Sequence, residues 1–155
     1  MIPFLHTVRQ RAIARAAVFR PKIVFPEGND PRIQDAARQI TNLGFAEPQL
    51  LASHTDALTE AADMVVRGDA HAMVAGAVHT TADVMRAAIK YIRPAPGLTT
   101  VSSAFYMVLP DPAPGQRPVW ESPSPVLTFT DCAVVPYPTV EQLADIAQAA
   151  AAARR

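Results

Sequence analysis

Residues 22–44 read KIVFPEGNDPRIQDAARQITNLG, and this stretch decides the fold. Its first four residues are mostly apolar and β-branched or aromatic, which predicts a buried strand that ends at the following proline. Asp30 is placed to cap a helix, and Pro31 would occupy the first helical position, where its missing N–H is harmless. An apolar stripe then runs to Gly44, which predicts the end of that helix. The stretch is therefore one strand–turn–helix unit.

The remainder of the chain repeats this alternation of short apolar runs and helical patterns. Further strands are expected at residues 48–52, 72–77, 99–109 and 126–135, and further helices at 56–67, 81–92 and 140–153. Thr139 would cap the last helix, with Leu143 and Ile146 facing inward. Residues 110–125 hold six of the fifteen prolines and are expected to form a loop. The expected fold class is α/β, with a mostly parallel sheet and flanking helices.

The first twenty residues carry four arginines and neither Asp nor Glu, a bias shared with organellar transit peptides. Serines, which such peptides usually contain, are missing there. Phe4, Leu5, Val8 and Ile13 fall mostly on one side of a helix, with the arginines largely elsewhere. An amphipathic first helix is the favoured interpretation.

Composition restricts the class of protein. The chain has 155 residues with 14 basic and 14 acidic side chains, and this zero net charge excludes a strongly basic nucleic-acid binder. Half of the residues are hydrophobic and 18% are charged, which is enough for one globular domain with its own core. No apolar run reaches the roughly 18 residues of a membrane span, and the single cysteine forms no intramolecular disulfide. We expect a soluble cytoplasmic enzyme or binding domain without a nucleic-acid or membrane partner.

Several familiar catalytic motifs are missing from the sequence. Neither of the glycine-rich phosphate-binding motifs, G-x-x-x-x-G-K-[ST] and G-x-G-x-x-G, occurs. There is no G-x-S-x-G nucleophile motif, and Cys132 lies in an apolar strand pattern typical of a packed thiol. The four histidines show no metal-ligand spacing, so no metal site is expected.

Residues 75–86, AGAVHTTADVMR, form the segment most suited to chemistry. A run of small residues ends at a polar turn, Thr80 and Thr81 lie at a helix start, and Arg86 follows inside the helix. Helix-terminal amides, hydroxyls and a guanidinium together suit an oxyanion or a phosphate. The alternative is plain capping by Thr80, Thr81 or Asp83, with Arg86 solvated, and the pattern favours neither.

Polar residues also interrupt the two late β-rich stretches. Ser102, Ser103 and Asp131 would lie near strand ends, where ligands bind in open parallel sheets. Solvation at a sheet edge or in a loop is an equally good interpretation.

Five ordered blocks of the sequence, at residues 23–32, 73–86, 100–107, 129–136 and 141–147, resemble the phosphate acetyltransferase family. The resemblance implies an acyltransferase that exchanges acetyl between acetyl phosphate and coenzyme A. The family's phosphate butyryltransferases share its fold. The resemblance further implies a homo-oligomer, and both ligands would be substrates, with no cofactor or metal. Direct attack of the CoA thiolate on the acetyl carbon would be the mechanism.

Site residues can be carried over only where the motifs match. Arg86 matches the family's acyl-phosphate anchor and is the predicted catalytic residue. Thr80, Thr81, Ser102 and Ser103 are candidate hydrogen-bond donors for the substrates, and Asp131 is a weaker candidate.

Residues 1–155 are expected to form a single, partial acyltransferase domain, because family members are roughly twice as long. The path near residues 53–60 looks contracted, and a closing Asn-Asp-Leu-Ser-Arg-Gly-like motif has no counterpart in the sequence. Two hypotheses therefore stand. The chain is a shortened acyltransferase, or it is an inactive remnant that acts as a ligand-binding or interaction subunit. In either case exposed strand edges would favour association.

Overall fold

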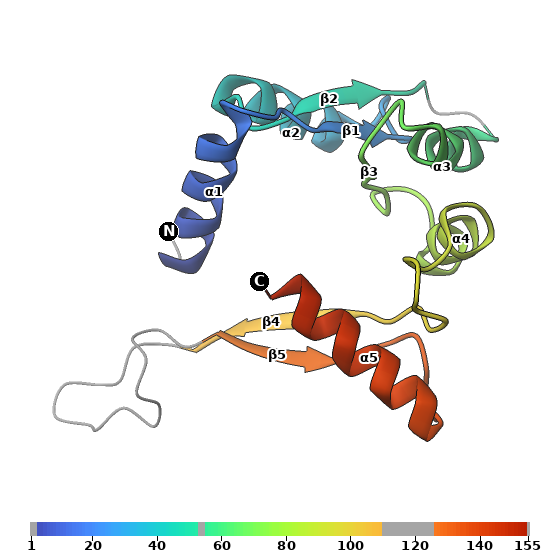
Figure 1. Ribbon diagram of the computed structural model, residues 1–155. Helices are drawn as coiled ribbons and strands as arrows, with labels where there is room; N and C mark the ends of the chain where they lie inside the picture. Colours follow the sequence, from blue (N-terminus) through green and yellow to red (C-terminus); the bar gives the residue numbers. More distant parts are fainter. Residues whose placement is uncertain (1–2, 53–54, 110–125, 155) are drawn as a thin grey trace, which may run out of the picture. The chain divides into compact units, whose positions relative to one another are not determined.

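The computed structural model describes residues 3–52, 55–109 and 126–154. The chain divides into two compact units (Figure 1). The first unit is Thr7–Arg93, and the second combines Met1–His6 with Pro94–Arg155. Each unit is described by itself below.

The first unit is built on a parallel sheet of three strands in the order β2-β1-β3. The central strand β1 (Lys22–Phe25) pairs with β2 (Glu47–Leu50) on one side and with β3 (Ala72–Met73) on the other. Helix α2 (Pro31–Leu43) packs against β2, and α3 (Ala57–Arg67) contacts β1 and β3. This arrangement confirms the expected α/β class with a parallel sheet and flanking helices.

The strand–turn–helix prediction for residues 22–44 is confirmed at both ends of α2. Asp30 caps the helix by accepting a hydrogen bond from the Arg32 N–H at 2.8 Å, with Pro31 as the first helical residue. Gly44 ends the helix in the left-handed conformation, with φ of 71°, which glycine adopts without steric cost.

The core of the first unit lies between the sheet and α3. Val24, Ala61 and Ala70 are essentially inaccessible to solvent. Ala61 lies on the buried side of α3, and its small side chain lets the helix approach the sheet closely. The partly buried Met64 and Met73 pack against this core. This core fixes the edge of the sheet from which the candidate site is built.

The strand expected at 72–77 is shorter than its sequence pattern suggested. It ends at Met73, because the amides from Gly76 onward turn toward another part of the chain. The helix expected at 81–92 is confirmed over its whole length, as α4 (Thr81–Ala87) followed by the π-helical segment η1 (Ala88–Ile92). Thr80 is its cap, so the helix starts at Thr81.

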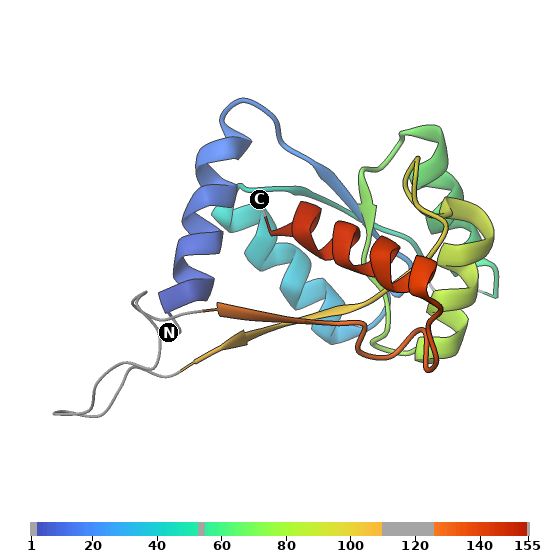
Figure 2. The same cartoon turned by 60° about the horizontal axis from the view of Figure 1, so that its bottom comes forward.

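The second unit contains an antiparallel pair, β4 (Ala104–Val108) and β5 (Val126–Thr130), and helix α5 (Val140–Ala153). Figures 1 and 2 show α5 lying along this pair, and its contacts are with β5. The Arg154 guanidinium lies 5.9 Å from the centre of the Tyr106 ring and donates to the Val126 carbonyl at 3.2 Å. The strands expected at 99–109 and 126–135 are thus confirmed over residues 104–108 and 126–130, whereas residues 99–103 and 131–135 lie outside the strands.

The predicted start of α5 is also confirmed. The Thr139 hydroxyl accepts from the Gln142 N–H, and the Gln142 side chain accepts from the Thr139 N–H, which is a capping box. Ile146 is buried as expected, but the expectation for Leu143 is wrong, because its side chain is 53% exposed. Ile146 is the residue of α5 that the described part of the chain buries.

Helix α1 (Pro3–Ala16) confirms the helix expected near the start of the chain. The expected apolar face is covered only in part by the described residues: Phe4 and Ile13 are half-buried, whereas Leu5 and Val8 are 53% and 46% exposed. None of the helices in the described ranges is both long and apolar enough to cross a bilayer.

Two expectations fall wholly or partly on residues that the structure does not describe. The proline-rich loop at 110–125 lies outside the described residues, as do residues 53–54 of the apparent contraction. The prediction of a single, partial acyltransferase domain over residues 1–155 stays a prediction.

Candidate functional site

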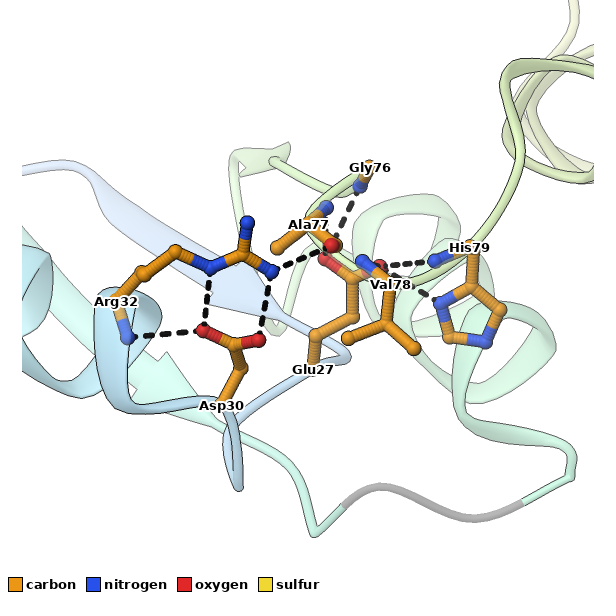
Figure 3. Close-up of polar contacts among 7 residues, drawn as sticks. All are labelled: Glu27, Asp30, Arg32, Gly76, Ala77, Val78 and His79. Atoms are coloured by element: carbon orange, nitrogen blue, oxygen red, sulfur yellow. Dashed lines mark hydrogen bonds and ion pairs between the residues drawn. The ribbon is translucent and has the colours of Figure 1, made fainter.

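The carboxylate of Glu27, two residues after β1, accepts hydrogen bonds from four consecutive backbone amides (Figure 3). Oε2 accepts from Gly76 at 3.0 Å and Ala77 at 2.8 Å, and Oε1 accepts from Val78 at 2.8 Å and His79 at 2.7 Å. The Nδ1 atom of the His79 ring lies 2.9 Å from the same Oε1. The Glu27 side chain is fully buried, so one carboxylate holds the whole turn that leads into α4.

These contacts decide the ionisation of Glu27. Burial of the carboxyl group opposes its ionisation, but the hydrogen bonds from the amides of His79, Val78 and Ala77 and from the His79 ring outweigh it. The pKa of Glu27 falls from 4.5 to about 2. Glu27 is therefore an anion at neutral pH, and its two oxygens act only as acceptors.

The turn that carries Glu27 is fixed on its other side by the end of β2. The Gly28 N–H donates to the Leu51 carbonyl at 3.0 Å, and the Leu51 N–H donates to the Phe25 carbonyl at 3.0 Å. A Cβ atom at position 28 would lie 2.4 Å from the Leu51 carbonyl oxygen, which only glycine avoids. The backbone on both sides of Glu27 is therefore hydrogen-bonded to the end of β2.

Arg32 adds a second connection to the same turn. Its Nη2 atom donates to the Ala77 carbonyl at 2.6 Å and to Asp30 Oδ2 at 2.8 Å. Hydrogen bonds from the Arg32 side chain and backbone lower the pKa of Asp30 to about 2. The Arg32 side chain is 70% exposed, so we assign it a positioning contact and little stabilisation.

Helix α4 shows the capping role for Thr80. Its hydroxyl accepts from the Asp83 N–H at 3.2 Å and donates to Asp83 Oδ2 at 2.6 Å. Arg86 pairs with Asp83 one turn earlier, and its side chain is 73% exposed. The Thr80 hydroxyl and the Arg86 guanidinium both lower the pKa of Asp83. Thr81, the first residue of α4, is exposed.

Several amides around the start of α4 already have partners, while the oxyanion hypothesis stays a prediction. That hypothesis uses N–H groups at the helix start. Those from Gly76 to His79 are occupied by Glu27, and the Asp83 N–H bonds to Thr80. Arg86 keeps an exposed guanidinium, and its role toward a substrate stays a prediction.

In the second unit, Asp131 organises the turn after β5. Oδ1 accepts from the Ser103 N–H at 2.8 Å and its hydroxyl at 2.7 Å, and Oδ2 accepts from the Val134 and Val135 amides. Burial opposes ionisation of Asp131, but these bonds hold its pKa well below the usual range. The Ser103 hydroxyl also accepts from the Cys132 N–H at 3.1 Å. These contacts give Asp131 a structural role in its turn, and its role toward a substrate stays a prediction.

The predicted site residues fall into two groups. The structure places Thr80, Thr81 and Arg86 together in the first unit. Ser103 and Asp131 contact each other in the second unit, where Ser102 is a half-buried neighbour. In the described part of the chain, no group of three or more His, Cys, Asp and Glu side chains is arranged to hold a metal ion.

Sequence reasoning missed Glu27 and His79. An acidic residue directly after a buried strand and Pro26 was the available signal for Glu27. Nothing local indicated its partners, because they lie 49 to 52 residues further along the chain.

Comparison with known proteins identifies the family. Residues 52–155, more than half of the chain, match the family described as "Phosphate acetyl/butaryl transferase". The chain belongs to this family. Its fold resembles that of a phosphotransacetylase from Streptococcus pyogenes, with a TM-score of 0.75 and 25% identity. That similarity covers 95% of this chain and 56% of the S. pyogenes protein.

Curated relatives carry the same family name. A phosphate acetyltransferase from Nitrosomonas europaea is 40% identical over 72% of this chain. One from Haemophilus influenzae is 33% identical over 87% of it. The matched regions are 14% and 24% of those proteins, so the chain spans only a small part of them. These similarities do not favour an inactive remnant over an acetyltransferase.

Proposed function

We propose that this chain transfers acetyl groups between acetyl phosphate and coenzyme A, a reaction of acetate metabolism. The observation that carries the proposal is the family match over residues 52–155, which includes the Glu27-bound turn and Arg86. The names of the curated relatives favour acetyl as the acyl group. Both ligands are substrates in this proposal, and no further cofactor takes part.

The proposed reaction is direct attack of the CoA thiolate on the acetyl carbon, with phosphate as the leaving group. Arg86 binds the phosphate of acetyl phosphate through its exposed guanidinium, whose planar donors match phosphate oxygens. The Thr80 and Ser103 hydroxyls donate to carboxylates, which supports positioning roles for both. Thr81 is exposed and Ser102 is half-buried, which supports donor roles toward a substrate for their hydroxyls.

Acetyl-CoA formation by the purified 155-residue chain tests this proposal. We expect Arg86→Ala to lower kcat/KM by roughly 100-fold or more, the effect of removing a charged group that binds the reacting phosphate. Arg38→Ala is the matched control, because Arg38 also pairs with an aspartate three residues earlier and is 71% exposed. The control should stay within about twofold of wild type, as expected for a surface pair.

Two results would contradict the proposal. Equal losses in Arg86→Ala and Arg38→Ala would remove Arg86 from the site. A folded wild-type chain that makes no acetyl-CoA would contradict the proposed activity itself.

We extend the proposal to self-association and a cytoplasmic location. Phe105, Met107 and Phe129 share one face of the β4–β5 pair and are 59%, 49% and 55% exposed, which supports association through that face. The single cysteine suits a reducing compartment. Light scattering that finds only a monomer would contradict the association.

A further inference from the structure

We propose that His79 is the general base that takes the proton from the CoA thiol, and that Glu27 is the positioning residue that orients it. This inference rests on the proposed acetyl transfer. It starts from a buried carboxylate against one nitrogen of an imidazole whose side chain is 24% exposed. Figure 3 shows the other ring nitrogen on the side away from that carboxylate.

The hydrogen-bond network assigns the tautomer of His79. Glu27 is ionised and can only accept, so the His79 Nδ1 atom, 2.9 Å from Oε1, must carry the hydrogen. In the neutral ring this leaves an unprotonated Nε2. An acidic side chain that fixes Nδ1–H and leaves Nε2 as the acceptor is the arrangement by which histidine serves as a base.

His71 provides an internal contrast. Its Nδ1 atom accepts a hydrogen bond from the Lys22 N–H at 3.0 Å, so in the neutral ring the hydrogen is on Nε2. Its ring stacks edge-on against Phe19 at 4.9 Å. His71 and His79 thus have opposite tautomers in one unit, and only His79 has an Nε2 lone pair backed by a carboxylate.

The charged groups around the His79 ring are held in place by hydrogen bonds and ion pairs. The Glu27 carboxylate lies 2.9 Å from the His79 Nδ1 atom, so that nitrogen is engaged and Nε2 is left to accept a proton. Arg32 pairs with Asp30, and on α4 Arg86 pairs with Asp83. Each of these two cations thus has an aspartate as its partner, and Arg32 also interacts with the Glu27 charge.

His79 also has a suitable place in the chain. It directly precedes Thr80 and Thr81, and Arg86 follows in the same segment. Four amide bonds to Glu27 hold the backbone of this segment. A base, a hydroxyl donor and a phosphate-binding cation are therefore supplied by one continuous stretch with a fixed starting point.

In the proposed step, one proton and one acetyl group change partners. The thiol S–H proton moves to His79 Nε2, and the sulfur electron pair forms a bond to the acetyl carbonyl carbon. The bond between that carbon and the phosphate oxygen breaks, and its electrons leave with the phosphate. The His79 imidazolium returns the proton to the phosphate, so the ring is neutral again after each turnover.

The tautomers are tested first, without any substrate. A two-bond ¹H–¹⁵N correlation spectrum of the histidine rings near pH 8 should show Nδ1–H for His79 and Nε2–H for His71. Predominant Nε2–H at His79 would overturn the proposal, since that nitrogen could then accept no proton.

The role in transfer is tested with His79→Asn, because the asparagine amide can replace the Nδ1–H donor to Glu27 but offers no base. At pH 7 we expect kcat/KM to fall by about 10²- to 10⁴-fold, the usual contribution of a general base. The deficit should shrink to less than about tenfold near pH 9, where the thiol, with an ordinary pKa of about 8.5, ionises by itself. His71→Asn is the matched control and should keep wild-type activity.

The outcomes separate this inference from the proposed function. An active wild type with an equally active His79→Asn, or with a deficit that is the same at every pH, overturns the role of His79 alone. A folded but inactive wild type overturns the acetyl transfer, and with it the thiol as the source of the proton.

Discussion

Two carboxylates follow strands in this molecule, and both bind backbone amides, but over very different distances along the chain. Glu27 follows β1 and binds four amides that lie 49 to 52 residues ahead. Asp131 follows β5 directly and binds three amides two to four residues ahead, together with Ser103, 28 residues back. One carboxylate joins distant segments, and the other mainly closes its own turn.

The two carboxylates also differ in how deeply they are buried. The Glu27 side chain is completely inaccessible, whereas Asp131 is partly exposed. Water can therefore replace some of the bonds to Asp131 but none of those to Glu27. The comparison indicates that the segment before α4 depends on one buried distant side chain, with the exposed Arg32 as a second contact, while the turn after β5 has several partly exposed supports.

The largest expected effect comes from Glu27→Gln. Glutamine has nearly the same shape, but its NH₂ group would face two of the amide N–H groups that the carboxylate now accepts. Leaving buried donors unpaired should destabilise the first unit by about 3 kcal/mol. Amide hydrogen exchange should accelerate at residues 76–79.

Glu47→Gln is the matched control for this experiment. Glu47 begins β2 in the same sheet, and its side chain is exposed, so its change should stay within about 0.5 kcal/mol. Unchanged amide exchange at residues 76–79 in Glu27→Gln would show that this turn is stable without the Glu27 carboxylate. Glu27 would then not differ from Asp131 in how much its turn depends on it.

Acid should reproduce part of this effect in the wild-type protein. The pKa of Glu27 is lowered from 4.5 to about 2, so its contribution to stability is fully present above pH 4.5 and is lost as the pH falls through 2. The difference between these pKa values corresponds to about 3 kcal/mol at full protonation. In urea unfolding, the gap between wild type and Glu27→Gln should therefore narrow from pH 6 to pH 2. A difference in the free energy of unfolding that stays the same from pH 6 to pH 2 would mean that the charge of Glu27 contributes nothing to stability.

Local patterns predicted the parts of this structure that depend on neighbours in sequence. The caps formed by Asp30 and Thr139 and the stop at Gly44 each rely on residues within a few positions. The β-α alternation likewise predicted the parallel sheet around Val24, because periodicity reports burial directly.

The candidate site was predicted less well, since its geometry depends on long-range bonds. The small-residue run 72–77 has a strand pattern, but the buried anion at Glu27 competes for its amides from Gly76 onward, and β3 ends at Met73. The same bond network makes His79 noteworthy, although its sequence context shows only a lone histidine before two threonines. A buried ionised acid selects its partners in three dimensions, which no local spacing records.

The smallest expected effect is that of Ser103→Ala, which tests whether the Asp131 turn has independent supports. The substitution removes one donor to Asp131 and one acceptor from the Cys132 N–H but keeps the Ser103 backbone bond. Since these groups are partly exposed, we expect a loss of about 1 kcal/mol in urea unfolding of the second unit. Ser102→Ala, which alters a neighbouring hydroxyl outside the Asp131 cluster, should cost less. A Ser103→Ala loss as large as that of Glu27→Gln would mean that Asp131 too depends on one side chain, and the contrast between the two carboxylates would fail.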